Sequence, residues 1–275
     1  MVRVVLSVEY DGSAFEGWQS QPHGRTVQDV LQKAVREIAG HDVILHCAGR
    51  TDTGVHATTQ IAHFDTDAQR PLSAWVRGVN SHLPPSVSVH WSQCVGDDFH
   101  ARFSAEARRY RYVLLNQPVR PAILAGKVGW HHAPLDLVAM QLACKSLVGQ
   151  HDFSAFRAAS CQANTPIRLM HLAQVGRQGK CLYFDFAANG FLHHMVRNLV
   201  GALVHIGKGE AGPDFMGELL RQADRRQSPP TFAPDGLYLC GIRYPEHHGL
   251  PDQGQLFVPP AITGSSCEPE SRSVD

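Results

Sequence analysis

The spacing of apolar residues along the first hundred positions predicts a mixture of strands and helices. Residues 3–9 largely alternate between polar and apolar side chains, which is the period of a half-buried strand. From Thr26, apolar residues recur every three or four positions as far as Ile38, and Gly40 follows, so we expect a capped amphipathic helix. Further strands are expected near residues 43–47, 59–66 and 87–94, and a further helix near residues 73–82.

The second half of the chain repeats this rhythm loosely, without a repeat of sequence. Its patterns predict strands near residues 107–115, 168–175, 181–187 and 237–243, and helices near residues 135–147, 191–206 and 215–222. Strands and helices mixed in this way favour the α+β class. Beyond Pro245 the composition turns to Pro, Gly, Ser and acidic residues, which predicts a disordered tail over residues 246–275.

Composition excludes several classes of protein. Hydrophobic residues make up 43% and charged residues 18% of the 275 residues, which is typical of soluble globular domains. No apolar run reaches the length of a membrane span, and the first ten residues lack the core of a signal peptide, so we expect a cytoplasmic protein. The seven cysteines never form C-x-x-C, and the histidine pairs at 131/132, 193/194 and 247/248 match no common ligand spacing, so no metal is expected.

Charge is distributed unevenly, although the formal net charge is +0. Residues 246–275 hold five acids and one base, so the preceding residues carry a net charge of +4. Residues 100–127 alone hold six bases and one acid. Because Lys and Arg bind phosphates, this segment points to a nucleic-acid partner.

The segment Gly49-Arg-Thr-Asp-Thr-Gly54 falls on a loop between two expected strands. Glycines at both ends allow positive φ or close backbone approach, so Asp52 could be displayed openly. An arginine nearby keeps a carboxylate ionised, and an ionised, positioned aspartate can be a nucleophile. The alternative is an Asx-turn, in which Asp52 only hydrogen-bonds its own backbone.

Aromatic and basic residues are interleaved in two places. In the strand Arg108–Tyr112, the two tyrosines share one face and Arg109 and Arg111 the other. Tyrosines that stack on bases and arginines that contact phosphates are a common way to hold RNA, but tyrosines in the core and arginines in solvent fit equally well. The polar loop 11–25 also carries Phe15 and Trp18, which we expect to be exposed.

The expected helix 191–206 has a continuous polar face. A partner or substrate could approach this face closely at its glycine, or the face could simply be solvated. The face comprises His194, Arg197, Asn198, Gly201 and His205.

Several separated motifs, in the same order, resemble the TruA-type tRNA pseudouridine synthases. The resemblance covers about residues 3–244. Thr53 departs from the pattern, since many members have alanine there, but it is small. The motifs are Tyr10–Gln19, Thr26–Leu31, Gly49–His56, Arg109–Tyr112, His151–Phe153, Phe191–Asn198 and Gly236–Leu239.

The resemblance implies roles for individual residues. Asp52 matches the essential aspartate, which attacks either the uracil ring or C1′ of the ribose. Tyr110 matches the tyrosine that stacks on uracil and is proposed to help remove the C5 proton, and Arg197 matches the arginine that pairs with the aspartate. Arg50 matches an arginine thought to assist extrusion of the base. The expected catalytic set is Asp52, Tyr110 and Arg197, and the expected substrate-binding set is Arg50, Tyr110, Arg109, Arg111 and His194.

The resemblance also implies an architecture and a reaction. Two ferredoxin-like subdomains, residues 1–104 and 105–245, would form a continuous, mainly antiparallel sheet with helices on one face and a central active-site cleft. The expected protein is a homodimer that isomerises uridine to pseudouridine at tRNA positions 38, 39 and 40, in the anticodon stem-loop. Because this isomerisation involves no net redox change or hydrolysis, no cofactor is expected.

Three other functions remain open from the sequence. The chain could act on a different RNA, because substrate choice depends on loops whose conformation cannot be inferred from sequence. It could be a non-catalytic RNA-binding module in which Asp52 is structural. A hydrolase that uses Asp52 and His56 as an acid–base pair is a third possibility.

Overall fold

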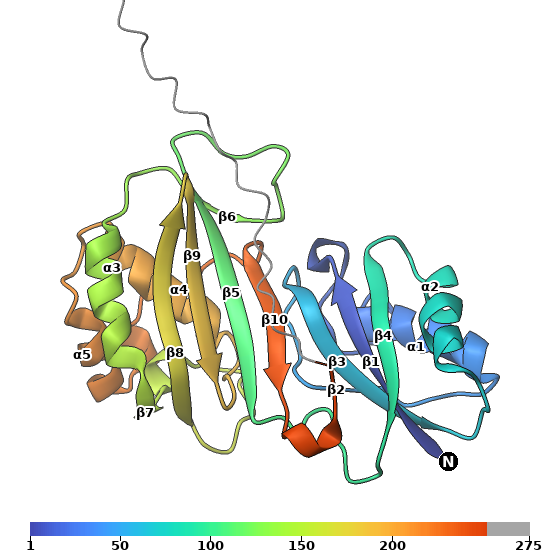
Figure 1. Ribbon diagram of the computed structural model, residues 1–275. Helices are drawn as coiled ribbons and strands as arrows, with labels where there is room; N and C mark the ends of the chain where they lie inside the picture. Colours follow the sequence, from blue (N-terminus) through green and yellow to red (C-terminus); the bar gives the residue numbers. More distant parts are fainter. Residues whose placement is uncertain (252–275) are drawn as a thin grey trace, which may run out of the picture.

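A single sheet of ten strands runs through the molecule (Figure 1). The computed structural model describes residues 1–251. Along the sheet the order is β4-β1-β3-β10-β5-β9-β8-β7, with β2 paired to β3 and β6 paired to β5. The strands are β1 (Val2–Tyr10), β2 (His46–Cys47), β3 (His56–Thr66), β4 (Val87–Val95), β5 (Ala107–Asn116), β6 (Gly129–His131), β7 (Gly149–Asp152), β8 (Ile167–Gln178), β9 (Cys181–Ala188) and β10 (Leu237–Arg243).

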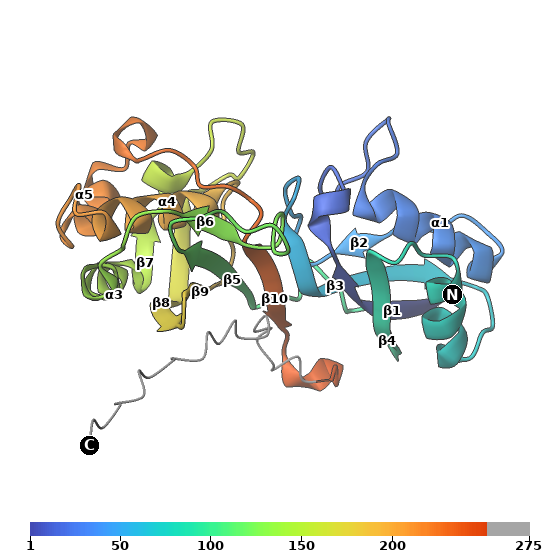
Figure 2. The same ribbon diagram turned by 90° about the horizontal axis from the view of Figure 1, so that it is seen from above.

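Helices α1, α4 and α5 lie on the same side of the sheet, whereas α2 and α3 lie toward its two outer edges (Figure 2). The α+β class expected from the sequence is confirmed by this arrangement. No helix within residues 1–251 combines the length and apolar character needed to cross a membrane. The helices are α1 (Val27–Ala39), α2 (Val79–Ser81), α3 (Leu137–Cys144), α4 (Met195–Gly207) and α5 (Phe215–Gln222).

Helix α1 begins and ends where the sequence predicts. The Thr26 side chain accepts from the backbone N–H of Asp29, whose carboxylate accepts from the N–H of Thr26, so both residues form a capping box. Gly40 adopts φ 77° and ends the helix. The apolar stripe includes Leu31 and Val35, both fully buried. Local sequence therefore marks the two ends of this helix, and burial of its apolar stripe packs it on the core.

The two halves of the sheet meet at a short parallel pairing. Tyr238 and Leu239 of β10 pair with His56 and Ala57 of β3, while β10 runs antiparallel to β5 along its other edge. Within residues 1–251 the remaining strand pairs are antiparallel, except for that of β5 with β6. One hydrophobic core extends across both halves. The loop that precedes β3 is consequently held at the centre of the molecule.

The structure differs from the predicted elements where the local pattern was weak. The strand expected at 43–47 is reduced to His46–Cys47, and the helix expected at 73–82 contains a π-helical turn at Ala74–Gly78. Strands β6 and β7 were not predicted, because three or four residues carry too little periodicity.

The expected tail is ordered at its start. Residues Glu246–His248 form a 3₁₀ turn, and the ring of His248 packs against Phe99 with centroids 5.1 Å apart. The side-chain amide of Gln93 donates to the carbonyl of Gly249. These contacts hold residues 246–249 against the first half of the molecule, contrary to the expectation of disorder there. The rest of the expected tail, residues 252–275, lies outside the described residues.

A buried histidine makes the stability of this fold depend on pH. Burial, together with the neighbouring His100 and His46, lowers the pKa of His63 to about 3. Between the ordinary histidine pKa of about 6.5 and the lowered pKa of His63, this side chain binds a proton in the unfolded chain but not in the folded one. The free energy of unfolding therefore falls as pH falls through this range. We expect a slope of up to about 1.4 kcal/mol per pH unit from this one group. Urea unfolding at a series of pH values measures it.

The matched variant for this prediction is His63→Asn. The Nδ1 atom of His63 accepts from the N–H of Ala101 at 3.1 Å, and an asparagine oxygen can take its place. The variant should unfold with a shallower dependence on pH between 6.5 and 4. An unchanged slope would show that His63 is already protonated in the folded protein.

Candidate active site

The loop that carries Asp52 lies between β2 and β3 and is anchored through Gly49 and Thr51, which precede the aspartate. The side-chain amide of Gln60 bonds to the N–H and the carbonyl of Gly49. The hydroxyl groups of Tyr10 and Thr51 are 2.7 Å apart. The backbone N–H of Trp18 donates to the carbonyl of Thr51. Because the neighbouring residues are fixed, the position of Asp52 is set by the fold.

Glycines of the loop 11–25 let this segment touch the backbone of the aspartate loop. A Cβ added to Gly12 would lie 2.0 Å from the carbonyl oxygen of Val55, and one added to Gly17 would lie 2.9 Å from that of Thr51. Gly17 also has φ 85°. The expectation of exposed aromatic rings in this loop is wrong: Phe15 is 8% and Trp18 1% exposed, and the ring of Trp18 packs on Tyr10 with centroids 5.8 Å apart.

Asp52 faces three basic side chains from the second half of the molecule. Its Oδ2 is 3.2 Å from Nη1 of Arg197 and 3.4 Å from Nε2 of His194. Its Oδ1 is 3.3 Å from Nε2 of His193. The carboxylate remains 23% exposed. The carboxylate is thus held by contacts with residues far away in the sequence and remains accessible, rather than being closed off by an Asx-turn.

Helix α4 begins later than its periodicity predicts. His194 adopts φ 61°, a left-handed conformation that is unusual for a residue other than glycine, and helical geometry starts at Met195. The turn directs the imidazoles of His193 and His194 toward Asp52, with ring centroids 4.0 Å apart. Burial lowers the pKa of His194. Backbone strain at this point therefore coincides with the placement of two side chains beside the carboxylate.

The polar face of α4 is covered by the chain itself. Arg197 donates from Nε to the carbonyl of Phe232, and the N–H of Phe232 donates back to the carbonyl of Arg197. Asn198 is fully buried, with its amide oxygen accepting from the hydroxyl of Thr231. The expected approach of a partner or substrate at Gly201 is blocked, because Pro230 and Phe232 of the chain itself lie against this glycine. The middle of this face is therefore covered, whereas the side chains of His194 and His205 each remain 30% exposed.

Replacing Gly201 with alanine should destabilise the protein and slow its reaction. Alanine normally stabilises a helix interior relative to glycine, by about 1 kcal/mol. Here the added Cβ would lie 2.4 Å from the carbonyl oxygen of Pro230, so we expect a net loss of about 1–3 kcal/mol. Urea unfolding measures it. In the control Gly217→Ala, in α5, the Cβ meets no atom closer than 3.6 Å, and equal effects of the two variants would contradict the account.

Tyr110 lies beneath the aspartate loop. Its side chain is 8% exposed, its ring meets Phe191 edge-on at 5.0 Å, and its hydroxyl lies below Gly49. Burial raises the pKa of this hydroxyl, and the charge of Asp52 raises it further. Tyr112, on the same face, is fully buried and donates to the carbonyl of Ala233. Only Tyr110 of this pair is therefore placed near Asp52.

Arg108 connects the elements around Asp52. Its guanidinium donates five hydrogen bonds to four backbone carbonyls and forms no ion pair among the described residues. Ala48 immediately precedes the aspartate loop, and Asn189 lies just before the turn into α4. Burial lowers the pKa of this side chain. The four acceptors are the carbonyls of Ala48, Arg102, Ala105 and Asn189.

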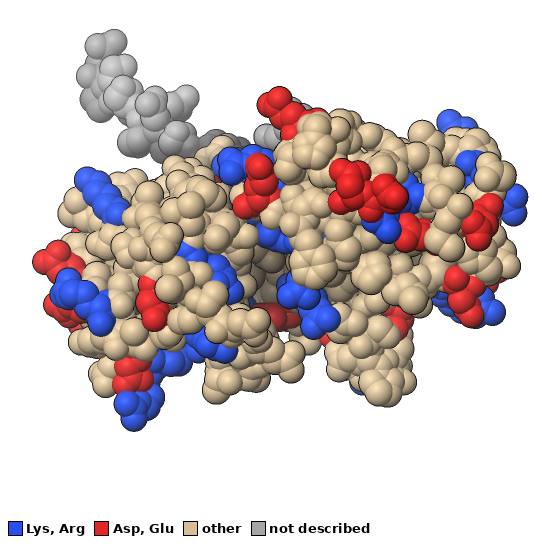
Figure 3. All heavy atoms as spheres, turned by 90° about the horizontal axis from the view of Figure 1, so that it is seen from below, with Lys and Arg blue, Asp and Glu red and all other residues tan. Residues whose placement is uncertain are grey.

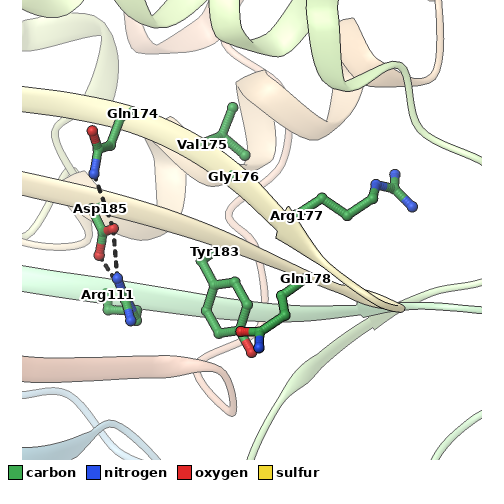
Figure 4. Close-up of a pocket in the computed structure, with 8 residues that line it drawn as sticks. All are labelled: Arg111, Gln174, Val175, Gly176, Arg177, Gln178, Tyr183 and Asp185. Carbon is green, nitrogen blue, oxygen red and sulfur yellow. Dashed lines mark hydrogen bonds and ion pairs between the residues drawn. The ribbon is translucent and has the colours of Figure 1, made fainter. Parts of the chain in front are cut away.

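The structure does not bring Arg109 and Arg111 to Asp52. Alternation along β5 directs both to the face opposite Tyr110. Arg111 forms two hydrogen bonds, of 2.7 and 2.8 Å, with the buried Asp185. This pair lines a hollow of about 380 Å³ on that face (Figure 4). The lining comprises Arg111, Gln174, Val175, Gly176, Arg177, Gln178, Tyr183 and Asp185.

His56 is unsuited to the acid–base pairing with Asp52 that a hydrolase would need. Its side chain is 2% exposed, Nδ1 accepts from the N–H of Gly12, and Nε2 lies 3.1 Å from the carbonyl of Asp235. Burial lowers its pKa, and its ring stacks on Tyr238 at 4.6 Å. Both ring nitrogens are occupied, so this residue links β3 to the segment before β10.

Arg50 is exposed beside Asp52, and its guanidinium forms no ion pair within residues 1–251. Figure 3 shows a hollow between the two halves of the molecule, bordered by Lys and Arg side chains on both sides. The basic segment 100–127 does not form one strip. Arg108 and Arg111 are engaged in the interior and Lys127 pairs with Asp11, whereas Arg102 and Arg120 are exposed.

The spacing of histidines in the sequence did not predict that His193 and His194 would both contact Asp52. One ligand atom from each of Asp52, His193 and His194 lies within 4.8 Å of the others, an arrangement that could accommodate a metal ion. Asp98, His247 and His248 form a similar group, in which Asp98 and His247 are exposed. Arg197, in contact with Asp52, adds a positive charge that opposes a cation at the first group.

Comparison with known proteins identifies the family. A family model described as tRNA pseudouridine synthase matches residues 6–104 and 143–245. The tRNA pseudouridine synthase A of Aromatoleum aromaticum is 60% identical over 261 residues, which is 95% of this chain and 99% of that protein. The proteins of the same name from Dechloromonas aromatica and Chromobacterium violaceum are 59% and 57% identical, over 94% and 92% of this chain and 98% and 97% of theirs.

Among solved structures, a chain of a Cbf5-Nop10-Gar1 complex covers 86% of this chain and 57% of its own, at 11% identity and a TM-score of 0.32, which is too weak a likeness to bear on fold or function. The family match and the relatives together cover the aspartate loop and α4. This chain belongs to the tRNA pseudouridine synthase family.

Proposed function

We propose that this protein isomerises uridine to pseudouridine in the anticodon stem-loop of tRNA, at positions 38, 39 and 40. The observation that carries the proposal is the accessible carboxylate of Asp52 in the first half of the chain, which Arg197 of the second half contacts at 3.2 Å. Family membership supports the reaction, since the relatives bear the name tRNA pseudouridine synthase A. Asp52, Tyr110 and Arg197 form the catalytic set.

The reaction uses the Asp52 carboxylate as a nucleophile. The carboxylate attacks either the uracil ring or C1′, the N1–C1′ bond breaks, and the base turns so that C5 bonds to C1′. Arg197 orients Asp52, because it contacts Oδ2 and is itself fixed by Phe232. Uridine and pseudouridine are isomers, and there is no net oxidation or reduction, so the reaction needs no cofactor.

The uridine must leave its stack to reach Asp52, which costs a few kcal/mol. Contacts inside the hollow offset this cost. Arg50, exposed and without an ion pair in residues 1–251, contacts the RNA and assists extrusion of the base. Tyr110 contacts the uracil with its ring, and His194 lies beside the ribose. Arg109 and Arg111, on the opposite face, do not belong to this set.

We also propose that residues 1–104 and 105–245 are two ferredoxin-like subdomains, with the cleft between them. The family match, which pauses after residue 104, supports this boundary. The resemblance to the family supports two further proposals: the protein is a homodimer, and it acts in the cytoplasm. Light scattering of the purified protein tests the first, with twice the 30.2 kDa chain mass expected.

Substrate choice is tested by mapping pseudouridine in RNA from a strain that lacks this chain. We expect pseudouridine to disappear from tRNA positions 38, 39 and 40, and to return when the chain is restored. Loss confined to another RNA, or to another arm of tRNA, would favour a pseudouridine synthase with a different target. An unchanged map would favour a non-catalytic RNA-binding module.

A further inference from the structure

One step of the reaction still lacks an acceptor. Once C5 has bonded to C1′, the C5 proton must leave so that the C5–H electron pair can form the C5=C6 double bond, while N1 takes up a proton from water. Tyr110 is near, but its raised pKa keeps the hydroxyl protonated at neutral pH, so it cannot accept this proton. Arg197 is a permanent cation and cannot accept it either.

We propose that His193 takes up the C5 proton at Nε2 and passes it to solvent past Ser160. This inference rests on the proposed function. Nε2 of His193 lies 3.3 Å from Oδ1 of Asp52. Arg197 and His194 contact the other carboxylate oxygen, Oδ2. An imidazole placed there reaches the same ribose and base that the carboxylate attacks.

The surroundings of His193 provide a route by which the proton can leave the site for solvent. Its Nδ1 lies 3.1 Å from the hydroxyl of Ser160, which is exposed, and its own side chain is 38% exposed. Protonation of Nε2 can therefore be matched by loss of a proton from Nδ1 to the hydroxyl and water. The backbone N–H of His193 donates to Sγ of Cys161, which fixes the residue against this loop.

His194 is less suited to the same step. Burial lowers its pKa; the charge of Asp52 opposes this, and His193, Arg197 and Arg225 lower it further. It also contacts Oδ2, the oxygen already paired with Arg197. We therefore assign to His194 the role of holding the carboxylate, and to His193 the role of accepting the C5 proton.

The test separates bond rearrangement from proton loss. In 5-fluorouridine, fluorine replaces the proton, so the reaction proceeds through formation of the C5–C1′ bond and then stops. With His193→Gln we expect rearrangement of 5-fluorouridine in tRNA at the wild-type rate, measured by mass spectrometry. Tritium release from 5-tritiated uridine should slow about 10²-fold. The variant should also gain a primary isotope effect with 5-deuterated uridine.

Controls make each outcome decisive. Ser160→Ala, which keeps the imidazole, should slow tritium release less and show the same isotope effect. His90→Gln removes an exposed histidine that pairs with Glu9, and should change neither rate. If His193→Gln slows rearrangement of 5-fluorouridine as much as tritium release, or shows no isotope effect, the proposal is wrong. If wild-type protein rearranges neither nucleoside, the proposed function itself fails.

Discussion

Replacing Asp52 with asparagine should abolish pseudouridine formation and leave tRNA binding intact. The amide keeps the shape of the side chain but removes the nucleophilic oxygen, so we expect tritium release to fall by at least about 10³-fold. Affinity should not fall, because Asp52 repels rather than attracts phosphate. Tritium release and filter binding with the same labelled tRNA measure the two quantities.

The control for this substitution is Asp67→Asn. Asp67 is an exposed acid that pairs with the terminal amine, away from the aspartate loop. It should leave both measurements unchanged. Turnover by Asp52→Asn at the wild-type rate would show that the carboxylate is structural, as in the Asx-turn interpretation.

Removing the guanidinium of Arg108 should produce the largest loss of stability. Arg108→Met leaves the carbonyls of Ala48, Arg102, Ala105 and Asn189 without their donor. An unsatisfied buried acceptor costs about 1–3 kcal/mol; the bonds to Ala48 and Ala105 are partly buried, whereas those to Arg102 and Asn189 are exposed and can be replaced by water, so we expect a net loss of about 2–4 kcal/mol. Urea unfolding measures it.

Activity of Arg108→Met should fall even at temperatures where the protein remains folded. Ala48 and Asn189 precede the two segments that bring Asp52 and His193 together, so their relative placement depends on this side chain. Arg120→Met, at an exposed arginine of the same basic segment, should change stability by no more than about 0.5 kcal/mol. Similar stability of the two variants would mean that the carbonyls find other donors.

Much of the fold follows from local pattern. The capping residues Thr26 and Gly40 mark the ends of α1, and period-two alternation locates β1, β5, β9 and β10 to within about two residues. What the pattern does not contain is the pairing of strands far apart in sequence. The parallel contact of β3 with β10 joins residues about 180 positions apart, and no local feature predicts it.

The candidate site, too, could be predicted only in part, because its residues come from segments far apart in the sequence. The loop motif identifies Asp52, and the family resemblance singles out Arg197, which lies 145 residues away and contacts it. The environment of each side chain in the fold decides between roles that the sequence leaves open. Arg108 and Arg111 look alike in the basic strand, yet one binds carbonyls beside the site and the other pairs with Asp185 on the far face. His193 carried no separate signal, because its position depends on the left-handed turn at His194.

The most direct measurement is tritium release from an unmodified tRNA transcript labelled at C5 of uridine, using the purified chain. The account predicts one tritium released for each pseudouridine formed, with the RNA strand intact and no free uracil. Strand cleavage or release of uracil would indicate a hydrolase, and binding without tritium release would indicate an RNA-binding module. Either result would contradict the assignment of Asp52 as the nucleophile of an isomerase.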